Sequence, residues 1–310
     1  MDIGGIARER WARRSCGRLF HGVGEGKPGL TIDRYGPVCL VQTWRDGLSK
    51  EAMEELELPG KVVYVPRGSD RPWHGPTLQA DFDELDLQYV FRTPDPGTDP
   101  VLFLDLRATR RWLKANAKGR VLNAFAYTCG AGLAAASNGA DVLNLDHGTA
   151  CMEQGREFAN KNELNMRFLR EDYFCAVRQF AGLGVRNKKG MRRYKSQKFE
   201  LVVLDPPNFA KGPFGAVDIV RDYGSLARPA LGVLTEGGRL LATNHHASVN
   251  YDVWVEGIKK TATKAGLSIT SVERIKVEDD FPSFDGNPPL KVAVFTVGRS
   301  QEGAASTQGG

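Results

Sequence analysis

Short apolar segments alternate with helix-forming segments from residue 119 to residue 297, and this alternation constrains the fold more than any other feature of the chain. Several of the apolar segments are hydrophobic at consecutive positions, which is typical of strands buried on both faces. Seven strands are expected, at residues 120–125, 141–145, 166–169, 199–204, 239–243, 267–275 and 291–297. The pattern favours a doubly wound, mostly parallel, Rossmann-like α/β sheet with helices on both faces.

Helices are expected between these strands, at residues 133–137, 149–161, 174–180, 217–234 and 249–265. Gly237 and Gly238 are expected to end the fourth of these helices, and Gly266 to cap the fifth, because glycine adopts the backbone conformation of a helix stop. Residues 86–298 are therefore predicted to form one large domain. The tail at 299–310 consists mainly of Gly, Ser, Ala and Gln, and it is expected to be disordered.

The first 85 residues have a different pattern, which predicts a small α+β domain that could bind RNA or another substrate. A helix is expected at residues 4–14 and another at residues 49–56. Two β-type segments flank the turn Gly36-Pro37, which favours a hairpin, and a further strand is expected at residues 61–65.

The overall composition indicates a soluble cytoplasmic protein. The 310 residues carry a formal net charge of +5, which is compatible with a nucleic-acid partner but does not require one. The five cysteines include no Cys-x-x-Cys pair and the histidines show no metal-ligand spacing, so we expect reduced thiols and no metal. No apolar segment is long enough to cross a membrane. The basic residues 6–18 are interpreted as a surface helix, with an organelle-targeting segment as the alternative.

The first strand is followed by a glycine-containing loop that could hold a nucleotide-like ligand. In a doubly wound sheet, ligands bind at the carboxyl ends of the strands. Gly130 and Gly132 allow close approach of the backbone to the ligand, and the amino terminus of the following helix can face a carboxylate. A tight turn without a ligand is the alternative. The residues expected to line the ligand site in this loop are Asn123, Phe125, Tyr127, Thr128 and Gly130.

Acidic residues end the second and third strands. Asp146, with His147 beside it, is placed to accept hydrogen bonds from both hydroxyls of a ribose, although it could instead stabilise the helix that follows. Asp172 could accept from an adenine amino group and Tyr173 could cover the ring. The alternative for Asp172 is the N-cap of the next helix.

The fourth strand ends in Asp205-Pro206-Pro207-Asn208-Phe209, which is the most specific motif of the chain. Two consecutive prolines make a stiff turn and direct the groups after Asp205 into the site. Phe209 is a candidate aromatic plate for an unstacked base.

These motifs together resemble one family, the class I methyltransferases that modify the 23S RNA of the large ribosomal subunit at cytosine or guanine. The resemblance is carried by Phe103-Leu-Asp-Leu-Arg107, the loop at 123–132, Asp146, Asp172, Asp205–Phe209 and residues 240–244, and upstream by residues 18–22 and 28–36. It implies S-adenosylmethionine as methyl donor and RNA, of ribosomal origin, as acceptor. It also implies that Asp105 and Arg107 flank the methionine end of the donor, Asp146 its ribose, Asp172 its adenine and Asp205 the reacting methyl group.

The chain departs from the family at several positions. No N-terminal PUA domain is expected, because the central-domain motif starts near residue 18. Residues 97–101 and Cys129-Gly130 differ from the usual motifs. Where family members that make 5-methylcytosine resemble Thr-Cys-Ser, this chain has Thr243-Asn244-His245-His246. Carbon-5 of a pyrimidine needs a thiolate that adds to carbon-6, so Asn244 favours direct transfer to a base nitrogen.

A basic segment at residues 186–198 contains seven positive charges and no acid. It is interpreted as a phosphate-tracking loop in which Tyr194 stacks on a base, and a solvated insertion is the alternative. The residues expected to contact RNA are Lys188, Lys189, Arg192, Arg193 and Tyr194.

The sequence therefore predicts an RNA methyltransferase that acts directly on a nucleobase, guanine or another ring or amino nitrogen rather than cytosine C5. The expected catalytic residues are Asp205, Pro206, Pro207, Phe209 and Asn244. His245 and His246 could contact the base or phosphate, or have no role. A methyltransferase for a small molecule or a protein, and a catalytically silent RNA-binding homologue, are the alternatives.

Overall fold

The computed structural model describes residues 1–44, 46–67, 75–95, 97–185, 191–283 and 287–299. Contacts divide the chain into two compact units. The N-terminal unit comprises Met1–Arg107 and Glu278–Gly286, and the second unit comprises Ala108–Val277 and Asn287–Gly310. The division thus falls at residue 107 rather than at the expected residue 85, and the N-terminal unit includes a segment from far along the chain.

The N-terminal unit contains a four-stranded sheet of order β1-β2-β3-β4, formed by Cys16–His21, Leu30–Tyr35, Val38–Thr43 and Lys61–Pro66. The hairpin predicted around Gly36-Pro37 is confirmed as the antiparallel pair β2–β3. Helix α2 (Lys50–Glu54) leads from β3 to β4, which are parallel. Helix α1 (Ile3–Trp11) confirms a helix near the amino terminus; Asp2 caps it and Ala7 is buried in the core of the unit. It ends before the expected residue 14, and residues 16–18, interpreted as part of a basic surface helix, begin β1 instead.

A second hairpin extends the N-terminal unit beyond residue 85. It consists of β5 (Gln79–Glu84) and β6 (Leu87–Arg92), and the short 3-10 helix η1 (Leu104–Leu106) follows it. The rings of Phe82 and Phe91 pack on Tyr35 of β2, with centroids 5.3 and 5.2 Å away. This aromatic packing explains why the N-terminal unit extends beyond residue 85, the boundary expected from the sequence.

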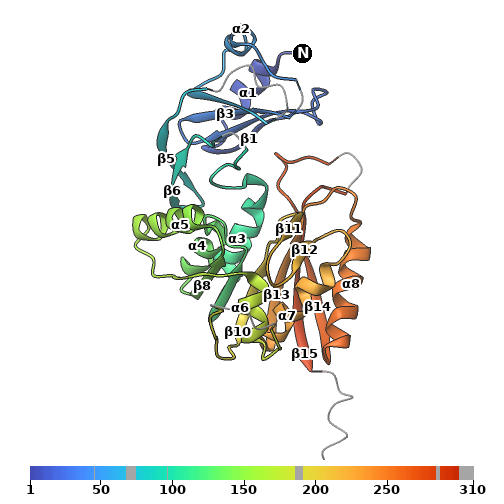
Figure 1. The fold of residues 1–310 in the computed structure, drawn as a ribbon. Coiled ribbons are helices and arrows are strands. Elements are labelled where there is room, and N and C mark those ends of the chain that lie inside the picture. The colour runs from blue at the N-terminus through green and yellow to red at the C-terminus, as the bar shows by residue number, and fades with distance from the viewer. Residues whose placement is uncertain (45, 68–74, 96, 186–190, 284–286, 300–310) are drawn as a thin grey trace, which may run out of the picture. The chain divides into compact units, whose positions relative to one another are not determined.

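The second unit contains a seven-stranded sheet of order β14-β15-β13-β10-β7-β8-β9, which confirms the predicted doubly wound fold (Figure 1). Strands β9, β8, β7, β10 and β13 are parallel, whereas β15 runs antiparallel to both of its neighbours. The strands are β7 (Arg120–Ala124), β8 (Asp141–Asp146), β9 (Arg167–Arg170), β10 (Phe199–Leu204), β13 (Leu234–Asn244), β14 (Leu267–Ile275) and β15 (Lys291–Arg299).

Six helices of the described residues accompany this sheet. They are α3 (Arg107–Asn116), α4 (Gly130–Ala136), α5 (Thr149–Lys161), α6 (Tyr173–Phe180), α7 (Tyr223–Gly232) and α8 (Tyr251–Lys264). Helices α4 and α5 contact each other, and α6, α7 and α8 contact one another in series (Figure 1). The main core lies between the last three helices and the sheet, and Phe180, Leu226 and Trp254 are among its buried residues.

The predicted helix at 217–234 is wrong at its start. Residues Phe209–Lys211 and Ala216–Asp218 form a small antiparallel hairpin, β11–β12. Helix α7 begins only after Asp222, whose side chain accepts a hydrogen bond from the backbone N–H of Ser225 at 3.1 Å. Gly237 and Gly238, expected as a helix stop, lie within β13. Of the tail expected to be disordered, Arg299 ends β15 and residues 300–310 lie outside the described residues.

Candidate active site

The candidate site lies where the order of the strands reverses. From β7 the chain continues to β8 and β9 on one side, and later to β10 and β13 on the other. Doubly wound sheets bind their ligands outside the carboxyl ends of the strands at such a point. The described residues at or directly after these strand ends include Phe125, Asp146, Glu171, Asp205 and His245.

The loop after β7 is held in an unusual backbone conformation. Phe125, Tyr127 and Cys129 have positive φ angles of 58°, 49° and 65°, which bulky residues rarely adopt. Backbone hydrogen bonds hold the loop, from Ala126 N to Leu145 O (3.1 Å) and from Cys129 N to Ala126 O (2.7 Å). Strained residues of this kind occur preferentially at ligand clamps and active sites, so the conformation supports a ligand-binding loop.

Asp146 is oriented by backbone groups on both sides. Its Oδ2 accepts from the N–H of Tyr127 and its Oδ1 from the N–H of Gly148, each at 2.8 Å. Gly148 is the N-cap of α5, so Asp146 serves the start of that helix as well as the strained loop. A carboxylate has about four acceptor sites, and two hydrogen bonds leave it able to accept from a pair of ribose hydroxyls. His147 is 84% exposed, and its Nδ1 lies 3.7 Å from Asp146 Oδ1.

Three residues expected at the ligand site, Asn123, Thr128 and Gly132, are buried. Asn123 is buried in β7 and its Nδ2 donates to Asn144 Oδ1 of β8 at 2.8 Å. A Cβ on Gly132 would lie 2.1 Å from that same Asn144 oxygen, so Gly132 is required for α4 to pack on the sheet. Gly132 thus has a role in packing, and its expected role beside a ligand stays a prediction.

The end of β9 combines a helix cap with an aromatic pair. Asp172 caps α6, and its Oδ1 accepts from Cys175 N at 3.0 Å, as the alternative interpretation expected. Tyr173 is buried, and its hydroxyl donates to the carbonyl of Leu226 at 2.6 Å. Its ring stacks on Phe125 with centroids 4.7 Å apart. Tyr173 therefore supports Phe125, whose ring is only partly buried.

Asp205 lies between β10 and β13. Leu204 pairs with Ala242 in the parallel register, so the residues that follow, Asp205 and Thr243, are neighbours. The hydroxyl of Thr243 donates to Asp205 Oδ1. Pro206 is buried and Pro207 is exposed. Phe209 is 58% exposed, which suits an aromatic plate. The sequence did not point to the side chain of Thr243, because its contact joins two strands 38 residues apart.

Asn244 is directed into the protein. It is fully buried, its Nδ2 donates to the carbonyl of Ile219 at 2.8 Å, and its Oδ1 accepts from His246 N at 3.1 Å. The side chain thus holds the loop after β13 and would reach an acceptor only if these bonds broke. Lys291, which the sequence analysis missed, is buried and donates to the carbonyl of His246 at 2.7 Å. His245 and His246 are partly buried.

Cys129 is not placed to act as a nucleophile. It is buried, with its Sγ 3.9 Å from Met152 Sδ. Burial raises the pKa of the Cys129 thiol far above its ordinary value, and the nearby Asp146 charge acts in the same direction. Since the thiolate is the reactive form, this residue has the properties of a packing cysteine.

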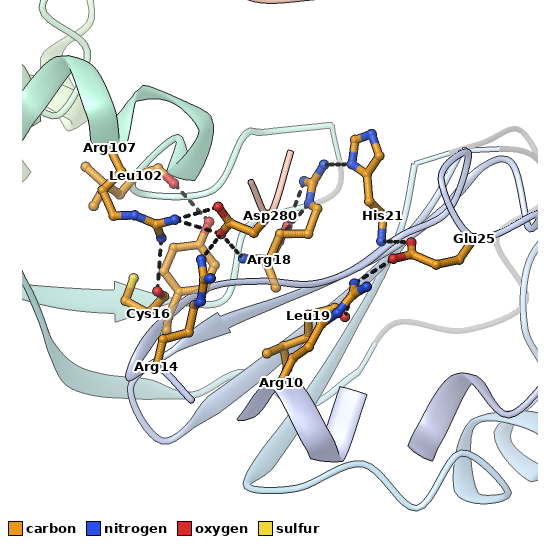
Figure 2. A network of polar contacts seen from close by, with 12 residues as sticks. Arg10, Arg14, Cys16, Arg18, Leu19, His21, Glu25, Leu102, Arg107 and Asp280 are labelled. Atoms are coloured by element: carbon orange, nitrogen blue, oxygen red, sulfur yellow. Dashed lines mark hydrogen bonds and ion pairs between the residues drawn. The ribbon is translucent and has the colours of Figure 1, made fainter. Parts of the chain in front are cut away.

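Arg107 is engaged in a buried ionic network of the N-terminal unit (Figure 2). Its guanidinium donates to both oxygens of Asp280 at 2.6 and 2.7 Å, to Glu278 at 2.6 Å and to the carbonyl of Cys16 at 3.0 Å. These contacts use all three of its nitrogens. Asp105 is partly buried in η1, and its charge helps to raise the pKa of Arg18. The roles of Asp105 and Arg107 beside a cofactor stay predictions.

The described part of the basic segment returns to the end of β9. Lys188 and Lys189 lie outside the described residues, whereas Arg192 and Arg193 are exposed. Tyr194 is anchored: its hydroxyl donates to Glu171 Oε2 at 2.8 Å and its ring packs edge-on against the core residue Phe180. This anchoring holds Tyr194, the residue that follows the two arginines, at Glu171 beyond the end of β9.

No helix among the described residues has the length and hydropathy of a membrane span. These residues also contain no group of three or more His, Cys, Asp or Glu side chains arranged to hold a metal ion.

The strand order, the oriented acid after β8 and the Asp-Pro-Pro turn after β10 define the class of protein as a class I S-adenosylmethionine-dependent methyltransferase. A family model independently matches residues 79–296, and the chain belongs to that family, the S-adenosylmethionine-dependent methyltransferases. S-adenosylmethionine is accordingly its methyl donor. The strained loop and the doubly anchored Asp146 fit such a donor, because they present backbone groups and a fixed carboxylate at the strand ends.

Individual proteins are similar to this chain over most of its length. The Ribosomal RNA large subunit methyltransferase I of Escherichia coli strain K12 is 26% identical over 302 residues, covering 86% of this chain and 69% of the relative. A methyltransferase solved in complex with S-adenosylhomocysteine (SAH) has a TM-score of 0.74 at 21% identity, covering 95% of this chain and 78% of the other. The SAM-dependent methyltransferase of Agrobacterium tumefaciens has a TM-score of 0.62 at 17% identity and 88% coverage of each chain.

Proposed function

We propose that this protein methylates a nucleobase of ribosomal RNA, at a ring or amino nitrogen of guanine or another base rather than at cytosine C5. The name of the Escherichia coli relative supports ribosomal RNA as the acceptor. The formal net charge of +5 and the exposed Arg192 and Arg193, which precede the anchored Tyr194, support a polyanionic substrate. The small N-terminal unit is proposed to take part in RNA binding.

The proposed roles of the residues follow their places in the second unit. Asp146 would bind the ribose hydroxyls of the donor, Asp172 its adenine, and the loop at residues 125–130 its amino-acid end. The bound donor supplies an electrophilic methyl group on a sulfonium. Asp205 would accept a hydrogen bond from the acceptor base, and Phe209 would stack on that base.

The choice of a base nitrogen as the methyl acceptor depends on one observation, the burial of Asn244 and Cys129. Methylation of cytosine C5 needs a thiolate at the base, because carbon-5 is a poor nucleophile without covalent activation. Asn244 is fully buried with both ends of its amide engaged, and the Cys129 thiol is buried with a strongly raised pKa. A ring nitrogen with an in-plane lone pair needs only alignment with the methyl group, and the sulfonium leaves as a neutral thioether, so proximity and orientation are sufficient. An amino nitrogen must in addition release a proton.

Nucleoside mass spectrometry tests this proposal. Ribosomal RNA from a deletion strain should lack one methylated nucleoside, and wild-type protein or Asp252→Ala, an exposed control on α8, should restore it. Asp205→Ala should not restore it. Unchanged ribosomal nucleosides would point to the small-molecule or protein alternative. Loss of 5-methylcytidine would overturn the nitrogen assignment.

A further inference from the structure

The strand end next to Asp205 carries a threonine whose hydroxyl has a defined direction. Thr243 is buried near the carboxyl end of β13, and its Oγ1 donates to Asp205 Oδ1. A buried hydroxyl without a partner is costly, so the pairing is a strong local constraint. The parallel register, in which Leu204 pairs with Ala242, brings the two side chains together.

A second contact holds Thr243 from its backbone. The hydroxyl of Tyr223, near the start of α7, donates to the carbonyl of Thr243 at 2.8 Å. Tyr223 is itself buried, and its ring packs edge-on against Trp254 with centroids 5.4 Å apart. Burial raises the pKa of Tyr223 well above its ordinary value, so this hydroxyl stays a donor. Helix α7 thus holds the backbone of Thr243, and the side chain of Thr243 orients the carboxylate of Asp205.

The hydrogen bond from Thr243 bears directly on the orientation of the Asp205 carboxylate. Pro206 and Pro207 make the following turn stiff, but the terminal torsion of an aspartate is broad. One hydrogen bond to Oδ1 selects the plane in which the carboxylate lies. A misplacement of a reacting group by about 1 Å can cost about 100-fold in rate, so selecting that plane matters for alignment.

We propose that Thr243 is a positioning residue that orients the Asp205 carboxylate toward the methyl acceptor, with Tyr223 as its support. The inference rests on the proposed function, in which Asp205 contacts the acceptor base. Thr243 itself touches neither the acceptor nor the donor in this scheme. It acts through Asp205.

Two substitutions separate the hydroxyl of Thr243 from its bulk. Thr243→Val keeps the shape and removes the donor, whereas Thr243→Ser keeps the donor. We expect Thr243→Val to lower kcat about 10-fold on ribosomal RNA from the deletion strain, and Thr243→Ser to stay within about 2-fold. The Kd for SAH, measured by calorimetry, should be unchanged in both. Thr296→Val on β15, in register with Arg239 in the middle of β13, is the matched control.

A readout independent of activity is the orientation of Asp205 in crystals. Crystals of Thr243→Val should show the Asp205 carboxylate rotated or in two orientations, and crystals of Thr243→Ser should retain the wild-type orientation. Full activity of Thr243→Val alongside an inactive Asp205→Ala would overturn the inference and leave the proposed function standing. An active Asp205→Ala would instead remove the proposed role of Asp205. Equal loss in the Val and Ser variants, with lowered melting temperature, would show a merely structural role and also overturn the inference.

Discussion

Replacing Asp280 by alanine should destabilise the N-terminal unit strongly. The Asp280 carboxylate accepts from Arg107 at 2.6 and 2.7 Å and from the backbone N–H of Arg18 at 2.9 Å, and it lies 3.0 Å from Arg14 Nη1 (Figure 2). The side chains of Asp280 and Arg107 are only 3% and 6% exposed. Removing the carboxylate leaves a buried guanidinium with Glu278 as its remaining acidic partner.

The size of the effect follows from this burial. Breaking a buried ion pair by removing one partner costs about 3–5 kcal/mol, because the other charge stays desolvated. Asp141 provides a matched control: it also binds an arginine with both oxygens, at 3.1 and 3.0 Å from Arg167, but the two side chains are 55% and 48% exposed. Asp141→Ala should therefore cost less than about 1 kcal/mol.

Urea unfolding, followed by circular dichroism at neutral pH, measures both variants. The transition that includes the N-terminal unit should shift to lower urea in Asp280→Ala and hardly move in Asp141→Ala. If Asp280→Ala does not fold, Asp280→Asn supplies the measurement, since it removes the charge but keeps the shape. Equal, small shifts for the buried and the exposed pair would refute the argument from burial.

The ion pair between Asp280 and Arg107 also predicts that the stability of the protein depends on pH. Burial by itself would raise the pKa of Asp280. The hydrogen bond and charge of Arg107, the hydrogen bond from the backbone N–H of Arg18 and the charge of Arg14 outweigh burial and lower this pKa below 3.8. A depressed folded-state pKa means that the stabilisation is fully present above the unfolded-state pKa and is lost as the pH falls through the folded-state value. The difference in the free energy of unfolding between wild type and Asp280→Ala should consequently decrease as the pH falls below about 4.

Three further predictions concern the site. Asp146→Ala should abolish measurable SAH binding in calorimetry while the fold is retained, because it removes the anchored carboxylate. Replacing Arg192 and Arg193 by alanine should weaken RNA binding and reduce the slope of log affinity against log salt by roughly 1.5 in filter-binding titrations. Cys129→Ala should keep methylation within about 3-fold in a methyl-transfer assay, because a buried thiol with a raised pKa supplies no nucleophile.

Each of these has a control within the chain. Asp141→Ala, at the opposite end of β8, should bind SAH normally, and wild-type SAH affinity in Asp146→Ala would contradict the ribose assignment. Replacing Lys260 and Lys264 on α8 by alanine matches the charge change of the arginine pair, and an equal loss of RNA affinity there would mean that only net charge matters. Loss of activity in a folded Cys129→Ala that still binds SAH would restore a covalent role.

Local patterns predicted most of the second unit. The limits of β10, α5 and β14 agree with the expected residues 199–204, 149–161 and 267–275, because these elements have clear hydrophobic periodicity. The helix expected at 217–234 failed because strand β12 and the Asp222 cap compete with helix formation over its first residues. The hairpin β5–β6 was missed because its core contact, Tyr35, lies more than 40 residues earlier.

The amino-acid sequence by itself determined the order of strands and helices and the acids that end the strands, since both depend on neighbours along the chain. Only the tertiary structure decided which way those side chains point and what they bind. Asn244 turns inward, Cys129 is buried, and Arg107 pairs with Asp280, 173 residues away. Burial and hydrogen-bond partners are determined by neighbours in space. The hydrogen bond between Thr243 and Asp205 is of the same kind, because it joins residues at the ends of two adjacent strands.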